Sequence, residues 1–206
     1  MNEQANLGKF LKLSREAQKC RRCENLCERV AVLSELNGNL NPKVMFIAEA
    51  PGRQGGDRTR MPFSGDASGA NLQTLLDSIN LKREEIFITN TVLCNPRKES
   101  GANRKPTKKE MKNCSEFLEK TIDLINPKII VTLGAVALEG LKAIAYHNFT
   151  LKLNAADILE WKNSLLIPLY HPSPQVIASH RRMHEQLADF QILKKAIEKT
   201  NNSPKI

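Results

Sequence analysis

Residues 45–69 read MFIAEAPGRQGGDRTRMPFSGDASG, and this stretch decides the fold expected for the chain. The stretch begins inside a continuous apolar run, Val44–Ala48, and continues beyond it. Such a run is typical of buried parallel strands. The run leads into a loop that contains five glycines, two prolines and two carboxylates, Asp57 and Asp66. Open α/β sheets bind ligands where a strand ends in a glycine-rich loop, so this loop is the first candidate for a binding site.

The rest of the chain predicts strands that alternate with helices. Apolar runs predict further strands at 86–89, 128–132 and 165–169, and helical periodicity predicts helices at 7–19, 68–79, 107–125, 134–144 and 181–199. Residues 146–163 have no clear pattern and fit a hairpin or an irregular excursion. Such alternation produces βαβ units with right-handed crossovers. We therefore expect an α/β fold, a three-layer αβα sandwich on a four-stranded, mainly parallel sheet, as a single domain over residues 1–206 with a polar tail from about residue 200.

The composition is that of a soluble globular protein with an excess of positive charge. Hydrophobic residues make up 41% and aromatic residues 5% of the 206 residues, and no apolar run reaches the length of a membrane span. The N-terminus lacks the features of a signal peptide. The 31 Lys and Arg against 22 Asp and Glu leave a net charge of +9, which favours a polyanionic partner. We expect a cytoplasmic, nucleoid-associated protein with no membrane partner.

The cysteines leave two alternatives open. The chain has five, at Cys20, Cys23, Cys27, Cys94 and Cys114. Without an export signal, disulfides are not expected, so the thiols either bind metal or are simply buried. A zinc ribbon would return with a second short knuckle, which this chain lacks, whereas iron–sulfur clusters accept dispersed ligands. The short spacing of Cys20 and Cys23 lets both thiolates reach one metal centre. Cys27 is better interpreted as a spare thiol than as a fifth ligand.

Other candidate residues each have a plain structural interpretation. Asp66 can cap the helix that follows it, because Asp is a favoured N-cap. His171 lies in an HPSP loop at the end of a predicted strand, where an isolated histidine is commonly structural. Asn90 at a strand end fits a turn, and Phe63 fits the core. The glycine-rich loop matches neither the Walker A motif nor the dinucleotide fingerprint, so nucleotide binding is poorly supported.

Seven short motifs, taken in order, point to a known family. They are CRRC at 20–23, EAPG at 49–52, PFSGDASG at 62–69, ITNTVLC at 88–94, PTKKE at 106–110, LGAVA at 133–137 and YHPSP at 170–174. Together they resemble the uracil-DNA glycosylase superfamily, specifically its iron–sulfur branch, families 4 and 5. The resemblance spans nearly the whole chain. It implies a monomeric, monofunctional DNA glycosylase of base excision repair that flips out and excises uracil, with other deaminated bases as further candidates.

The resemblance also implies roles for individual residues. Phe63 matches the aromatic residue that stacks on the flipped base, and Asn90 matches the amide that recognises the pyrimidine edge. His171 matches the histidine that hydrogen-bonds O2 of the departing base. Glu49 is a further catalytic candidate, at a position where it helps the backbone of Ala50 contact the base. The ligands of a structural 4Fe–4S cluster correspond to Cys20, Cys23, Cys94 and Cys114.

The catalytic carboxylate is where the chain differs from part of the family. Family-1 enzymes have an aspartate where this chain has Ala50, so that group is absent here. Family-5 enzymes also have alanine there and carry a carboxylate in the following loop, which makes Asp66 the leading catalytic candidate. Family 4 has an acidic side chain beside C5 of uracil, and this chain has Arg53 in that neighbourhood. The resemblance therefore leaves the range of bases open.

The segment after His171 is expected to grip DNA. The residues assigned to this role are Ser173, Gln175, Val176, Arg181 and Arg182, with Val176 or Ile177 as the wedge that enters the minor groove. Two other interpretations remain. One is a non-catalytic iron–sulfur protein that binds nucleic acid on the same fold, and the other is a plain zinc-binding α/β module.

Overall fold

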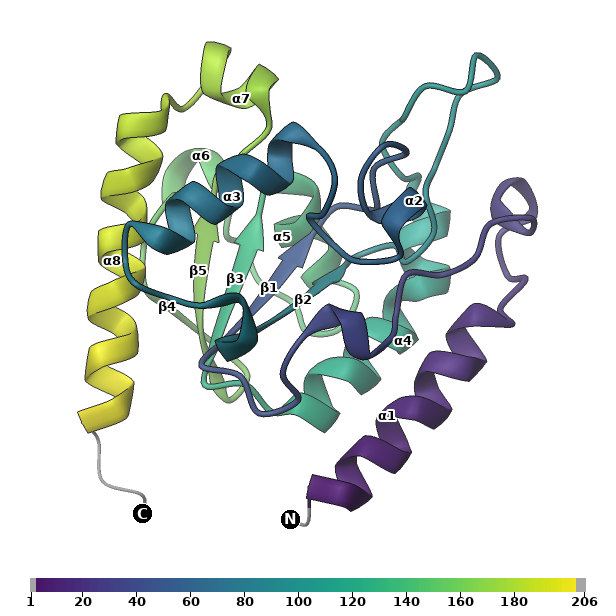
Figure 1. The fold of residues 1–206 in the computed structure, drawn as a ribbon, viewed down its shortest axis with the longest axis horizontal. Helices are drawn as coiled ribbons and strands as arrows, with labels where there is room; N and C mark the ends of the chain where they lie inside the picture. Colours follow the sequence, from purple (N-terminus) through teal and green to yellow (C-terminus); the bar gives the residue numbers. More distant parts are fainter. Residues whose placement is uncertain (1–2, 203–206) are drawn as a thin grey trace.

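The apolar run Val44–Ala48 forms β1, an inner strand of a five-stranded sheet, in a computed structural model that describes residues 3–202 (Figure 1). The strand order is β2-β1-β3-β5-β4. The other strands are β2 (Ile86–Asn90), β3 (Ile129–Leu133), β4 (Leu159–Trp161) and β5 (Ser164–Leu169). β1 pairs in parallel with β2 and β3, and β3 pairs in parallel with β5. The carboxyl ends of these four strands therefore meet at one edge of the sheet.

Helices cover both faces of the sheet, as the predicted βαβ units require. They are α1 (Glu3–Gln18), α2 (Gly56–Thr59), α3 (Ala67–Asp77), α4 (Lys108–Ile125), α5 (Ala135–Leu141), α6 (Leu151–Asn154), α7 (Pro174–Ser179) and α8 (Met183–Asn202), with short 3-10 helices at Glu24–Leu26, Glu35–Asn37 and Arg83–Glu85. α3 and α8 pack on one face, and α1, α4 and α5 pack on the other. This confirms the three-layer α/β architecture.

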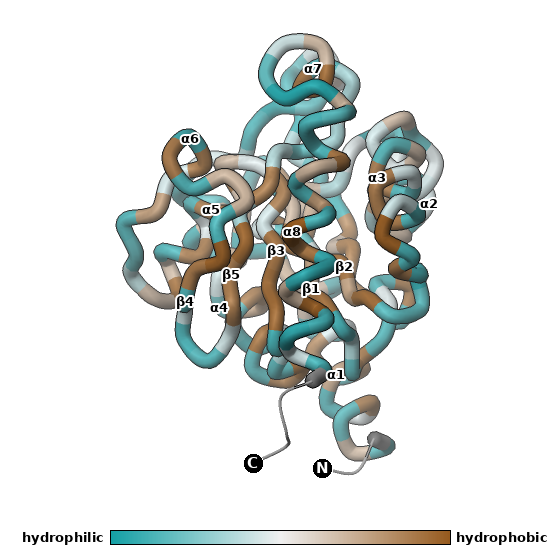
Figure 2. The backbone as a smooth tube through the Cα atoms, turned by 90° about the vertical axis from the view of Figure 1, so that its left-hand side faces the viewer, coloured by the Kyte–Doolittle hydropathy of each residue, from teal (hydrophilic) through white to brown (hydrophobic). Residues whose placement is uncertain are grey.

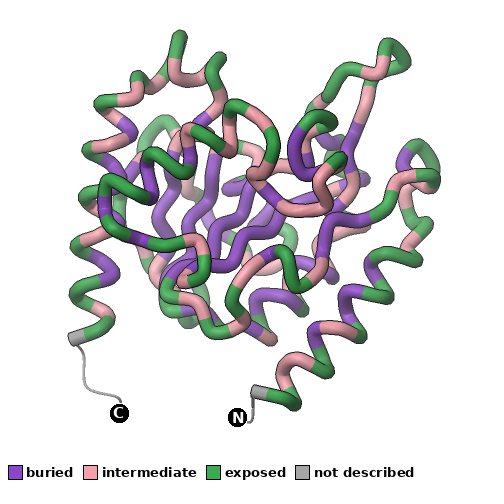
Figure 3. The backbone as a smooth tube through the Cα atoms, viewed as in Figure 1, coloured by how far each residue is buried: buried purple, intermediate pink, exposed green. Residues whose placement is uncertain are grey.

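Two apolar clusters, one on each face of the sheet, make up the core. Alternate residues of β1 face opposite sides, so Phe46 packs with the α3 and α8 layer and Met45 with the α1, α4 and α5 layer. The strands are accordingly brown in Figure 2 and buried in Figure 3, while exposed residues lie on the outer faces of the helices. Burial on both faces explains why β1 is apolar at every position.

The sheet has five strands, whereas we expected four, so this prediction is wrong by one strand. β4 lies in the stretch whose sequence has no clear pattern, and it pairs antiparallel with β5 through a tight connection at which Lys162 has a φ of +51°. Trp161 at its end is buried and donates from its indole Nε1 to the carbonyl of Ala145 (3.2 Å). A three-residue strand is too short to show alternation, so periodicity could not identify it.

The segment after His171 also differs from the expected loop. Residues Pro174–Ser179 form α7, whose N-cap Ser173 accepts from the backbone N–H of Val176. Serine before proline is a helix-start signal, because proline is well tolerated at the first helical position. The following helix, α8, begins at Met183 and continues through Asn202. The last four residues of the expected tail lie outside the described residues, and none of the described helices is long and apolar enough to cross a membrane.

Candidate active site and metal centre

A single pocket at the carboxyl edge of the sheet brings most of the predicted site residues together. It is built from the loop after β1, the end of β2 and the segment after β5. Nine of the candidates line it: Glu49, Ala50, Phe63, Asp66, Asn90, His171, Ser173, Gln175 and Val176. The pocket also includes Asn95, Asn103, Arg104 and Lys105, which come from the basic loop after β2 and which the sequence analysis did not select.

Asp66 lines this pocket and also caps a helix. Its Oδ1 accepts from the backbone N–H of Gly69 at 2.9 Å, which is the predicted N-cap of α3. Its Oδ2 has no hydrogen-bond partner within residues 3–202 and lies against Gly55, where an added Cβ would be 2.1 Å from that oxygen. The glycine therefore leaves room for the second carboxylate oxygen. One carboxylate oxygen thus caps the helix, and the other makes no hydrogen bond within the described residues.

Asp57, the other carboxylate of the loop, is held in ion pairs. Its Oδ2 is 2.5 Å from a guanidinium nitrogen of Arg97, and its Oδ1 is 3.7 Å from one of Arg60. The side chain is 11% exposed and does not line the pocket. Arg97 lies on another loop, 40 residues away in the sequence, so no local sequence pattern indicated its pairing with Asp57. Asp57 therefore has a structural role.

His171 is a neutral imidazole at physiological pH. Burial lowers its pKa from 6.5 to about 4, although the nearby charge of Asp66 partly opposes this shift. The ring lies against Phe63, with 5.4 Å between the ring centroids and an angle of 33° between the planes. Phe63 itself has a left-handed backbone with a φ of +54°, and its carbonyl packs where Gly69 has no Cβ. The loop thus holds the aromatic ring beside the histidine.

Asn90 carries a buried donor that lacks a partner. The residue ends β2 opposite Ala48 of β1 and is 3% exposed. Its amide Nδ2 makes no hydrogen bond to any residue in the described part of the chain. Leaving a buried amide unpaired costs about 1–3 kcal/mol, so such a group in a pocket is suited to a ligand that accepts a hydrogen bond. Glu49 is nearby in the pocket, and burial raises the pKa of its carboxyl while Lys105 opposes the shift.

The predicted DNA-contact residues fall into two groups. Ser173, Gln175 and Val176 lie at the start of α7 and line the pocket. Arg181 instead points back into the fold, where its guanidinium contacts both carboxylate oxygens of Asp189 (2.5 and 3.0 Å). Arg182 is exposed.

The segment of α7 is anchored from the opposite helix. Asn71 of α3 donates from Nδ2 to the carbonyl of Pro172 at 2.9 Å. The Arg181 guanidinium also lies over the ring of Tyr170, 5.9 Å from its centroid. These contacts fix both ends of the short helix, so they position His171 relative to Asp66.

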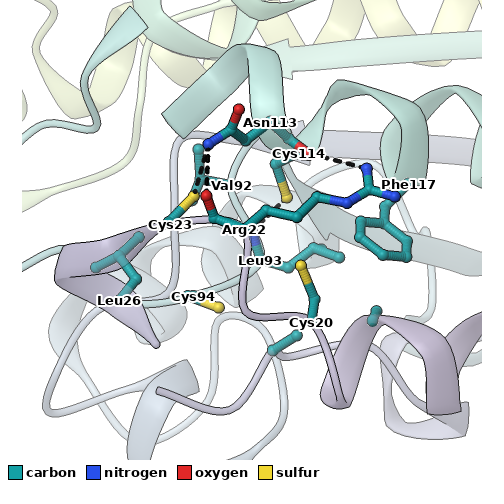
Figure 4. Close-up of a pocket in the computed structure, with 12 residues that line it drawn as sticks. Cys20, Arg22, Cys23, Leu26, Val92, Leu93, Cys94, Asn113, Cys114 and Phe117 are labelled. Carbon is teal, nitrogen blue, oxygen red and sulfur yellow. Dashed lines mark hydrogen bonds between the residues drawn. The ribbon is translucent and has the colours of Figure 1, made fainter. Parts of the chain in front are cut away.

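A second pocket is lined by four of the five cysteines (Figure 4). Cys20 follows α1, Cys23 lies in the next loop, Cys94 follows β2 and Cys114 lies in α4. Cys27 does not line this pocket. The apolar wall includes Leu26, Val92 and Phe117.

Polar groups around the sulfur atoms fit thiolate ligands. The backbone N–H of Leu93 donates to Sγ of Cys114 at 3.4 Å, and Asn113 donates to Sγ of Cys23 at 3.5 Å. Burial raises the pKa of Cys94 to about 11 and that of Cys114 to about 12. These thiols therefore need a cation to become thiolates at neutral pH.

The donor set of this pocket consists of four cysteines, the set that a 4Fe–4S cluster requires. Among residues 3–202, no three His, Cys, Asp or Glu side chains are close enough together to hold a single metal ion. One zinc ion needs its ligands about 2.3 Å from a common centre. In a 4Fe–4S cluster each of four thiolates binds a different iron, so the ligands lie farther apart. Four cysteines around one apolar pocket fit that donor set.

Hydrogen bonds connect the two pockets. Asn95 follows Cys94 directly and donates from Nδ2 to the carbonyl of Pro51 at 2.6 Å. Arg97 donates to Oδ1 of Asn95 and to Oδ2 of Asp57, both at 2.5 Å. The loop that carries a cysteine is thereby joined to the loop that begins with Ala50. Residues widely separated in sequence carry no pattern for such a network, and the sequence analysis missed it.

We predict that the folded protein loses stability in acid because the buried His171 has a lowered pKa. Its folded pKa of about 4 lies below the unfolded value of 6.5, so the unfolded chain takes up the proton first. The contribution is complete above pH 6.5, declines as the pH falls from 6.5 to 4, and amounts to about 3 kcal/mol of the free energy of unfolding. Urea unfolding of the wild type and of His171→Gln at a series of pH values measures the difference.

The exposed histidine His184 supplies the control for this measurement. His184→Gln should follow the wild-type curve, and His171→Gln should lose less stability in acid. Parallel curves for the wild type and His171→Gln would show that the burial of His171 has no such effect.

Comparisons with known proteins agree with this architecture. The model of the uracil DNA glycosylase superfamily matches residues 36–196. A type-4 uracil-DNA glycosylase of Thermotoga maritima is 36% identical over 162 residues, 78% of this chain and 80% of the relative. A type-4 uracil-DNA glycosylase of Archaeoglobus fulgidus is 32% identical, with 85% of this chain and 87% of the relative covered.

A type-5 uracil-DNA glycosylase of Pyrobaculum aerophilum is also similar. It is 31% identical over 170 residues, which cover 74% of this chain and 70% of the relative. The type-4 and type-5 names confirm the branch that the motifs indicated, and the family model covers all five strands and the helices from α2 to α7, with most of α8. This chain belongs to the uracil DNA glycosylase superfamily.

Proposed function

We propose that this chain is a monofunctional DNA glycosylase that hydrolyses the N-glycosidic bond of deoxyuridine in DNA and leaves an abasic site. The relatives named above support uracil as the base. The observation that carries the proposal is the unpaired, buried Nδ2 of Asn90 in a pocket shared with Phe63, Asp66 and His171. The proposal makes the protein a monomeric enzyme of base excision repair, located with the nucleoid in the cytoplasm.

Asn90 is the group that recognises the base in this proposal. Its Nδ2 donates to O4 of uracil, and its carbonyl oxygen accepts from N3–H. Cytosine presents the opposite pattern at both atoms, so the same amide rejects it. Phe63 stacks on the flipped base, and the backbone of Ala50, with Glu49 beside it, completes the pocket. Arg53, in the segment where family 4 has an acidic side chain, is exposed and does not line the base pocket, so we propose activity on other deaminated bases as well.

Asp66 and His171 divide the charge of the transition state. As the glycosidic bond lengthens, the sugar becomes cationic and the base becomes anionic. The Oδ2 of Asp66 stabilises the sugar and orients the attacking water, while the neutral imidazole of His171 donates a hydrogen bond to O2 of the base. Burial keeps that imidazole neutral. Ala50 cannot serve as the acid–base group, and Asp57 is held by Arg97.

The start of α7 holds the DNA. We propose that Ser173 and Gln175 contact the strand, that Val176 or Ile177 is the wedge, and that Arg182 binds phosphate. The side chains of Val176 and Ile177 are half-buried, which suits residues that brace a distorted base step. Arg181 supports this segment through its ion pair with Asp189 of α8.

We further propose that Cys20, Cys23, Cys94 and Cys114 hold a 4Fe–4S cluster. When bound, the cluster supplies structural cross-linking of α1, α4 and the loop after β2. This chain's own residues carry that rigidity onward, because Asn95 next to Cys94 bonds the loop at Pro51.

The activity test uses duplex oligonucleotides that carry uracil, hypoxanthine, xanthine or thymine, followed by alkali to reveal abasic sites. We expect cleavage at uracil by the wild type. In Asp66→Asn, turnover should fall on the order of 100-fold or more with DNA affinity retained, the usual scale for a positioned acid–base group. Asparagine caps helices as well as aspartate does, so this change preserves the cap of α3.

Two outcomes of this test would count against the proposal. Near-normal turnover in Asp66→Asn would return the residue to its cap role alone. Binding of DNA without release of any of the four bases would instead favour a non-catalytic nucleic-acid-binding protein.

The choice of base should depend on Asn90. In Asn90→Asp the donor to O4 becomes an acceptor, so the preference for uracil over cytosine should fall by about 10- to 100-fold, the scale of one or two buried hydrogen bonds. Single-turnover rates on matched uracil and cytosine duplexes measure this ratio. Asn41→Asp, at an exposed site before β1, is the matched control. An unchanged ratio in Asn90→Asp would remove Asn90 from base recognition.

The cluster proposal predicts different effects for two cysteines. Anaerobically purified wild type and Cys27→Ser should be brown and contain iron, because Cys27 lies outside the cysteine pocket. Cys114→Ser should lose iron and visible absorbance, since Cys114 lines the pocket. Equal iron content in the three proteins would contradict the assignment. A colourless wild type that contains zinc would show that the four cysteines form a zinc site and not an iron–sulfur cluster.

A further inference from the structure

A groove between α4 and α5 is rich in lysine. It is lined by Lys108 and Lys112 of α4 and by Lys142 at the end of α5, together with Met111 and Ser115. The two helices pack side by side on the same face of the sheet (Figure 1). We propose that this groove binds the sugar–phosphate backbone of the DNA duplex that flanks the damaged base. This inference rests on the proposed function in one respect, because the proposed function identifies the polyanion as DNA.

The charges of the groove are mostly uncompensated. Lys142 is paired with Glu139 at 2.9 Å, but Lys108 and Lys112 have no acidic partner within residues 3–202. These two lysines are four residues apart, so they lie on one face of α4 about 6 Å apart along its axis. Two free ammonium groups at that spacing can contact neighbouring phosphates of one strand. Like charges held together in this way favour an anionic partner.

The groove continues from the base pocket along the chain. Arg104 and Lys105 line the base pocket, and α4 begins three residues after Lys105. The connection is firmly held, because the guanidinium of Arg104 contacts both carboxylate oxygens of the buried Glu110 (2.6 and 2.8 Å). Positive groups thus extend from the pocket edge to the first turns of α4. A strand whose flipped base occupies the pocket is placed to follow them.

The chemistry of the groove suits a nucleic acid better than a protein. Protein interfaces depend on a few buried aromatic or other large anchor residues. The exposed large hydrophobic side chains of the described residues include Tyr146 and Leu153, and none of them lines this groove. Contacts with phosphate need only well-placed cations, and they position DNA without recognising its sequence.

The test compares two uracil-free duplexes of about one and about three helical turns. The triple variant Lys108→Gln/Lys112→Gln/Lys142→Gln removes the positive charge of the groove. The matched control, Lys9→Gln/Lys12→Gln/Lys195→Gln, makes the same charge change at exposed lysines of α1 and α8. Dissociation constants at several salt concentrations give the slope of log K against log salt, which changes by about 0.9 for each phosphate that the protein no longer neutralises.

We expect the slope of the groove variant to be smaller in magnitude by about 2 to 3 on the long duplex and by the same or a smaller amount on the short one, and the control to change neither. Equal reductions in the groove and control variants would overturn the proposal. Unchanged binding of both duplexes by the groove variant would also overturn it and would leave an acidic protein as the partner. Because the duplexes contain no uracil, the result is independent of whether the protein excises that base.

Discussion

The parallel pairing of β1 with its neighbours determines where the functional groups lie. Ala48 is opposite Asn90, and Leu133 is opposite Leu169, so the chain leaves all four strands at the same edge of the sheet. The backbone N–H of Gly134 donates to the carbonyl of Leu169 at 2.8 Å, which holds two of these exits together. Residues 49 and 50, Asn90 and His171 therefore gather at that edge. A register shift of one residue would turn the side chains of a strand to the opposite face of the sheet and break up the pocket.

Hydrogen bonds hold the base pocket and the cysteine pocket in a fixed position relative to each other. Besides the bond from Asn95 to Pro51, the guanidinium of Arg60 donates to the carbonyls of Val30 and Ala31 at 2.7 and 2.9 Å. The loop after β1 is thus attached both to the segment that follows the Cys-x-x-Cys pair and to the segment that follows Cys94. A loop rich in glycine loses much conformational entropy on folding, so it needs such outside contacts. The proposed cluster, by fixing those segments, would stiffen the loop that carries Phe63 and Asp66.

The sequence predicted the parts of the structure that have a local or periodic cause. β1 matches its apolar run, and α4 begins at the capping box in which Thr107 and Glu110 bond each other's backbone. The gathering of Asp66, Asn90 and His171 followed from their positions after parallel strands. β4 could not be found because its three residues depend on pairing with β5. The pairs Asp57–Arg97 and Arg181–Asp189 depend on tertiary proximity, for which one sequence carries no signal.

Asp66 shows how a structural and a chemical role can occupy one side chain. Capping requires a single carboxylate oxygen, and Oδ1 meets that need at Gly69. Carboxylates are favoured at the N-terminus of a helix, so aspartate suits both the cap of α3 and the proposed mechanism. Oδ2 remains available only because residue 55 is glycine. The glycines of the loop after β1 therefore do more than permit turns, since one of them leaves space for the second carboxylate oxygen of Asp66.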